Sequence, residues 1–125
     1  MSRSNETRAP REGTRDLATR RARIRELNDQ FRVSLSGGRV MITSGIRDLG
    51  PANILHVVNA VRTFGAFNDT NDPHAEHDFG SVEVAGARVF WKIDYYDHRY
   101  QYGSPDPSLP GLTGRVLTIM LASEY

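Results

Sequence analysis

Several residue types are rare or absent in this chain of 125 residues, and each absence excludes a class of protein. There is no cysteine, so a disulfide framework, a thiolate zinc site and a cysteine nucleophile are all excluded. No apolar run approaches the roughly 20 residues needed to cross a bilayer, and the polar N-terminus lacks the apolar stretch of a secretory signal. We therefore expect a cytoplasmic protein with no membrane partner.

The charges of the chain are unevenly distributed, and lysine is almost missing. Residues 1–32 hold nine basic and five acidic groups (+4), whereas residues 33–125 hold seven and ten (−3), which together give the formal net charge of +1.

Residues 1–13 contain hardly any apolar side chain, so nothing offsets the entropy lost when such a segment becomes ordered. We predict a disordered basic tail over 1–13 and a single domain over 14–125.

The spacing of apolar residues predicts two helices and four strands. One amphipathic helix with an arginine-rich face begins near Leu17, and a second follows Gly50-Pro51. The alternating or continuous apolar segments expected to form strands are 39–43, 79–84, 88–96 and 116–122. The order α-β-α-β-β-β predicts an α+β fold, with a mainly antiparallel sheet of about four strands and the two helices packed on one face. Because the last strand is apolar on both faces, it is expected to be covered on both sides.

A dense polar segment follows the second helix, over residues 71–78. Two imidazoles and several carboxylates lie within it, and His74, His77 and Asp78 have the side chains that zinc, manganese or iron prefer. A metal-dependent hydrolase or nuclease built on them would use Glu76 or Asp94 as the base. The spacing matches no established ligand signature, and such residues are common in turns. We therefore expect the histidines to be structural and predict no cofactor.

A second polar group lies on the strand 88–96 and in the loop after it. It contains Lys92, Asp94 and Asp97 together with the tyrosines Tyr96, Tyr100 and Tyr102. Tyrosine is common at binding surfaces because it offers apolar area and a hydroxyl together. Pairing with the preceding strand would bring this group beside Asp78 and form a shared polar pocket. Since no catalytic motif is present, we favour a non-catalytic protein-binding module.

The basic face of the first helix raises a third hypothesis, which is nucleic-acid binding. Arg20, Arg21 and Arg25 lie between the apolar positions of this helix and could neutralise phosphates. A solvated helix face explains the same residues, so we expect any such binding to be weak. The most plausible partner is another protein, and the sequence makes no prediction of oligomeric state.

Four ordered stretches, NDPHAEHDFGSVEV, VFWKIDYYD, QYGSPDP and RVLTIMLASEY, resemble small bacterial proteins of domain of unknown function family 3768. The resemblance extends from about Ile24, at the stretch IRELNDQFR, to Tyr125. It implies no activity, but the setting of the family on plasmids and other mobile elements implies a regulator such as an inhibitor of host defence or an antitoxin-like protein. The residues that the resemblance singles out are Asp72, His74, Glu76, His77, Asp78, Lys92, Asp94, Tyr96 and Asp97.

Overall fold

The computed structural model describes the backbone of residues 2–125 and the side chains of residues 16–125. The expected disordered tail over 1–13 lies outside the residues described in full, and it stays a prediction. None of the helices in the described part of the chain combines the length and the apolar character needed to cross a bilayer.

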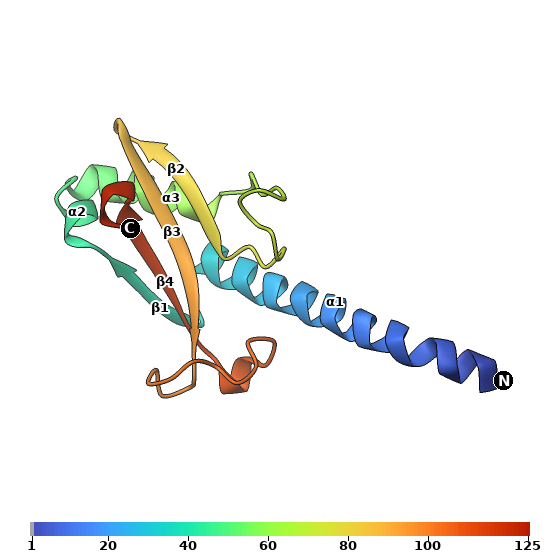
Figure 1. Ribbon diagram of the computed structural model, residues 1–125. Coiled ribbons are helices and arrows are strands. Elements are labelled where there is room, and N and C mark those ends of the chain that lie inside the picture. Colours follow the sequence, from blue (N-terminus) through green and yellow to red (C-terminus); the bar gives the residue numbers. More distant parts are fainter. Residues whose placement is uncertain (1) are drawn as a thin grey trace.

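The order of the main elements confirms the predicted α+β fold (Figure 1). The elements are α1 (Ser2–Ser34), β1 (Gly38–Ile42), α2 (Ser44–Arg47), α3 (Pro51–Arg62), β2 (Phe79–Val84), β3 (Ala87–Tyr96), the 3-10 turn η1 (Pro110–Leu112), β4 (Gly114–Leu121) and the 3-10 turn η2 (Ala122–Glu124). The single turn of α2 and the two 3-10 turns were not expected, because segments of three or four residues are too short to show a helical period.

The four strands form one mixed sheet in the order β1-β4-β3-β2. Strands β2, β3 and β4 pair antiparallel, whereas β1 runs parallel to β4. The β2–β3 hairpin turns at Ala85 and Gly86, whose φ angles of 53° and 76° are both positive, as a two-residue hairpin turn of type I′ requires. The last strand of the chain therefore lies inside the sheet, and β1 and β2 form its two edges.

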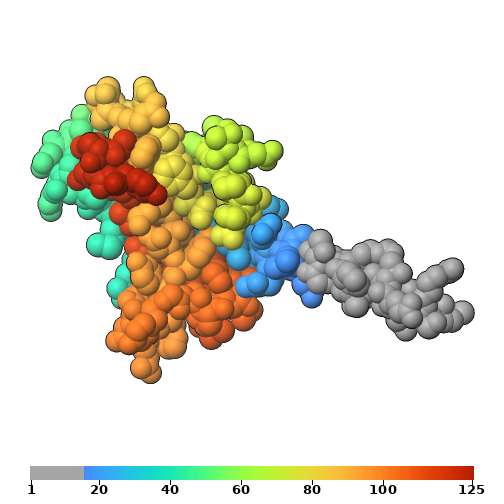
Figure 2. Space-filling view, in the orientation of Figure 1, coloured from blue at the N-terminus to red at the C-terminus, as the bar shows by residue number. Residues whose placement is uncertain are grey.

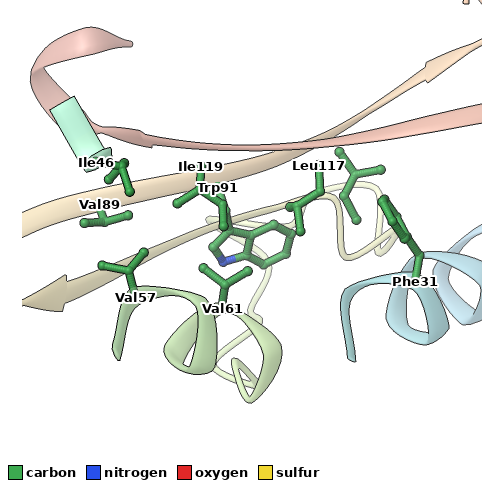
Figure 3. Close-up of a cluster of buried hydrophobic side chains, with 9 residues drawn as sticks. Phe31, Ile46, Val57, Val61, Val89, Trp91, Leu117 and Ile119 are labelled. Carbon is green, nitrogen blue, oxygen red and sulfur yellow. The ribbon is translucent and has the colours of Figure 1, made fainter. Parts of the chain in front are cut away.

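Helices α1 and α3 pack on the same face of this sheet and enclose the core (Figures 1 and 3). Trp91 of β3 is fully buried and faces Val61 of α3, and Phe31 of α1 lies at one end of the cluster. Gly80 on β2 is required here, because a Cβ at this position would collide with the Trp91 ring. The remaining buried members of the cluster are Ile46, Val57, Val89, Ile93, Leu117 and Ile119.

The opposite face of the sheet is covered at one end only, so the expectation that β4 is covered on both sides is half correct. Phe79, Phe90 and Tyr125 pack together there, with ring centroids 5.2 Å apart for Phe79 and Phe90 and 5.5 Å apart for Phe90 and Tyr125. Met120 pairs with Phe90 across the strands and is buried. Over the other half of this face no helix lies on the strands in the described residues (Figure 2).

Candidate functional site

The two polar groups noted in the sequence lie in different places, and the first is attached to α1. In the loop between α3 and β2, the Nδ1 atom of His77 lies 2.9 Å from a carboxylate oxygen of Asp29 on the helix. Its Nε2 atom lies 3.6 Å from an oxygen of Asp72, and its ring stacks on Phe67 with the centroids 3.7 Å apart. Both ring nitrogens of His77 thus face carboxylates of the protein itself.

The buried carboxylate of Asp72 holds the tight turn that presents this histidine. One of its oxygens accepts the backbone N–H groups of Glu76 and His77, at 3.1 Å and 3.0 Å. Ala75 and His77 have φ angles of 56° and 55°, in the left-handed region that residues other than glycine rarely adopt. Hydrogen bonds to Asp72 therefore stabilise a backbone conformation that is unfavourable by itself.

A buried hydrogen-bond network joins the same loop to α1 and to the centre of the sheet. The amide nitrogen of Asn28 donates to the Tyr95 hydroxyl at 2.7 Å and to the Glu76 carbonyl at 2.9 Å. The Tyr95 hydroxyl in turn donates to the Glu76 carboxylate at 2.8 Å, and Arg115 Nε donates to the Asn28 side-chain oxygen at 2.7 Å. Burial raises the pKa of the Tyr95 hydroxyl, so it keeps its proton and remains a donor.

The sequence analysis did not identify the α1 residues of this arrangement. Arg32, also buried, donates to the carbonyls of Val61 and Phe64 at the end of α3, both at 3.1 Å, and pairs with Asp29 at 2.8 Å. A cation at a helix C-terminus is stabilised by the helix dipole. A signal was present: Asn28 and Arg32 are four residues apart, within the apolar face of an amphipathic helix, where a polar side chain needs a buried partner.

The geometry gives the metal hypothesis no support. Within residues 16–125 no group of three or more His, Cys, Asp or Glu side chains is arranged to hold a metal ion. His74 is exposed, whereas His77 is held between Asp29 and Asp72. Burial raises the pKa of the Asp78 carboxyl, and the negative charge of Glu76 is the second cause of this rise. This cluster therefore resembles a structural latch between loop and helix.

The second polar group lies on the uncovered part of the sheet, where it lines a hollow of about 350 Å³. Lys92 Nζ and Asp94 Oδ2 form an ion pair at 2.9 Å, with both side chains about two-fifths exposed. The Arg39 guanidinium lies 3.7 Å from the centre of the Tyr100 ring. We call this surface the open face; its lining residues are Arg39, Met41, Lys92, Asp94, Tyr96, Tyr100, Val116 and Thr118.

The expected shared pocket between the two groups is wrong, because they lie on opposite sides of the sheet. Lys92 pairs with Phe79, which packs against Phe90 on the outer side. Asp78 precedes Phe79, and successive side chains of a strand point to opposite faces. Asp78 accordingly lies near Glu76 in the loop, away from Lys92.

Two further predicted binding residues lie in the loop after β3. Asp97 accepts the backbone N–H groups of Arg99 and Gln101, at 3.1 Å and 3.0 Å, and these bonds lower the pKa of its carboxyl. The turn that results carries Tyr100 over the open face, with a φ angle of 60° at Tyr100 itself. Tyr102 is 74% exposed and does not line the hollow.

Two of the three arginines proposed for nucleic-acid binding form contacts within the protein. Arg20 pairs with Asp106 at 3.0 Å, and Arg25 donates to the Ala75 carbonyl at 3.1 Å. Arg21 is exposed. These contacts attach α1 to the loop before β2 and to the loop between β3 and β4, and they leave fewer arginines available for phosphate groups.

Comparison with known proteins gives a family but no activity. No curated protein and no solved structure matches the chain. The family model described as "Protein of unknown function (DUF3768)" matches residues 42–124, so α1 and its stretch IRELNDQFR lie outside the matched range. This match covers well over half of the chain, and the protein therefore belongs to the DUF3768 family.

Proposed function

We propose that the protein is a non-catalytic module that binds another protein through the open face. The observation that supports this is the absence of any covering helix over half of the sheet in the described residues, at a place where apolar and charged side chains gather. Met41 is 56% exposed and Tyr96 is 36% exposed on this surface. Exposed apolar area that is rimmed by polar groups is typical of interaction sites.

The chemistry of the open face suits a protein surface better than a small charged ligand. Lys92 and Asp94 neutralise each other, and Arg39 is held over Tyr100, so the hollow has no strong excess of one charge. Arginine and tyrosine are enriched at the centres of protein interfaces. A partner with a few apolar side chains and one acidic group next to Arg39 would complement this surface.

The polar residues of the latch, which lie on the other side of the sheet from the open face, have partners within the protein, and this favours binding over catalysis. His77, Asp72 and Glu76 are all hydrogen-bonded within the latch. Inhibitors of host defence and antitoxin-like regulators, the roles that the family's setting on mobile elements suggests, act by occupying a partner and need no catalytic group. A module that binds through the open face could act in this way.

Site-specific photo-crosslinking tests the proposal. A photoreactive phenylalanine analogue at Tyr96, on the open face, should capture one specific protein in host cells, whereas the same analogue at Leu55, exposed on α3, should not. With the purified partner, Lys92→Glu should weaken binding measured by calorimetry, because it replaces the ion pair with Asp94 by repulsion. Arg88→Glu, on the same strand but outside the hollow, is the matched control. Capture from Leu55 alone, or equal binding by both charge variants, would refute this site.

A further inference from the structure

One edge of the sheet is unusually unprotected. Strand β1 has β4 as its one strand neighbour in the described residues, and its side chains Val40, Met41 and Ile42 are 38%, 56% and 39% exposed. Natural edge strands are normally protected by lysine, proline or a bulge, because an unpaired edge is a template for another strand. Strand β1 contains no lysine and no proline, and it pairs with β4 in a continuous register without a bulge. Its one charged residue, Arg39, is held over Tyr100.

The direction of the backbone N–H and C=O groups of β1 shows which of them could bond to another strand at this edge. The N–H of Thr43 donates to the carbonyl of Ile119 on β4, at 3.1 Å. The N–H and C=O of one strand residue point to the same side, and this side alternates along the strand. The backbone N–H and C=O groups of every second residue therefore point away from the sheet, and these residues are Gly38, Val40 and Ile42.

We propose that β1 pairs antiparallel with β1 of a second copy of this chain, about a two-fold axis at Val40. This register places Val40 opposite Val40 and Gly38 opposite Ile42, so every residue with outward backbone groups faces another such residue and can exchange both hydrogen bonds with it. A symmetric contact of this kind requires that one patch complement itself.

The side chains of β1 satisfy that requirement. The bulkiest exposed aliphatic side chain, Ile42, comes opposite Gly38, where the Phe31 ring lies in the place that a Cβ of Gly38 would take, so Ile42 would meet an apolar ring. Arg39 comes opposite Met41, so the two arginines of the pair avoid direct opposition, which would be destabilising. The other edge lacks these properties, because β2 carries an exposed Glu83 and contacts α3.

The pairing would join two four-stranded sheets into one continuous sheet. Arg39 and Met41 belong to β1 and also line the open face. The hollows of the two copies would therefore lie side by side across the junction. This inference concerns the assembly of the protein and goes beyond the proposed function, which does not depend on it.

The mass of the full chain in solution, measured by light scattering over a dilution series, tests the pairing. We expect a species of twice the chain mass that dissociates on dilution. Val40→Lys should raise the dimer dissociation constant by about tenfold or more, since like charges then face each other across the axis. Leu55→Lys adds the same charge on α3 and should leave the constant unchanged. Circular dichroism verifies that both variants are folded.

A cysteine variant decides the register even if Val40→Lys does not fold. The wild-type chain has no cysteine, so Val40→Cys introduces a single thiol, and the paired Cα atoms at a hydrogen-bonded position are about 5.5 Å apart, within the range of a disulfide. Mild oxidation should give a covalent dimer with Val40→Cys and none with Leu55→Cys. A monomeric wild type, or a dimer that Val40→Lys leaves intact and Val40→Cys fails to cross-link, would overturn the proposal.

Discussion

The side-chain oxygen of Asn28 accepts a hydrogen bond of 2.7 Å from Arg115, a residue 87 positions further along the chain. This bond connects α1, which lies before the range matched by the family model, to β4, which lies within it. The helix is therefore part of the same packed unit as the family domain, and its buried polar residues contact that domain directly.

Asn28→Ala should lower the free energy of unfolding by about 3 kcal/mol, because the substitution leaves the Nε atom of the buried Arg115 and the Glu76 carbonyl without a partner. Urea denaturation measures the change. Asn59→Ala, at an exposed position of α3, is the matched control and should change stability by less than about 0.5 kcal/mol. Equal effects of the two substitutions would show that the network contributes nothing specific.

The two histidines of the loop should behave differently when each is replaced by alanine. His77→Ala removes the contacts to Asp29 and Phe67 and should cost about 1–3 kcal/mol of stability. His74 is exposed, so His74→Ala should be nearly neutral. Thermal unfolding with and without added zinc measures both. If zinc raised the unfolding temperature of the wild type and of neither variant, the metal hypothesis would be restored.

Asp78→Asn should make the protein more stable at neutral pH. Burial and Glu76 raise the pKa of this carboxyl, so the folded state binds its proton more tightly than the unfolded state does. Its contribution to stability is fully present below the ordinary aspartate pKa and is lost as the pH rises through the raised value. Unfolding measured as a function of pH should show this loss in the wild type and not in Asp78→Asn. A variant less stable than the wild type at pH 7 would contradict the assignment.

The carboxyl of Asp106 should titrate far below a normal aspartate. Hydrogen bonds from Ser108 and then Arg20 lower its pKa to about 2. Its contribution to stability is present above the ordinary pKa and is lost as the pH falls towards 2. Ser108→Ala should raise the pKa of Asp106 more than Arg20→Ala does, as followed by the carboxyl chemical shift in NMR titrations. The reverse order would mean that the α1 contact is the stronger one.

The sequence predicted the elements well and their spatial neighbours poorly. The hairpin followed from Ala85-Gly86 between two alternating segments, and the core face of β3 followed from the period of two around Trp91. The parallel pairing of β1 with β4 could not be predicted, because the residues that pair are distant in the chain and no local pattern records which strand becomes a neighbour.

The site was more difficult to predict than the fold, for a related reason. The residues around His77 were recognised as a dense polar segment, but their partners Asn28 and Asp29 lie on α1 and were not identified. The prediction of a pocket shared with Lys92 was wrong because it considered only how close the residues lie along the paired strands. It did not consider that successive side chains point to opposite faces of the sheet. Which proposed residues bind a partner stays a prediction.

The position of β4 inside the sheet also affects the order in which the protein can fold. During synthesis β1 leaves the ribosome before α2, α3, β2 and β3, whereas β4, its one strand neighbour in the described chain, leaves it only after all of them. Until then the apolar side chains of Val40, Met41 and Ile42 have no strand beside them on either edge. Pairings between distant segments form slowly because a long loop must close first. The nascent chain is therefore most prone to aggregate through β1 in the interval before β4 emerges.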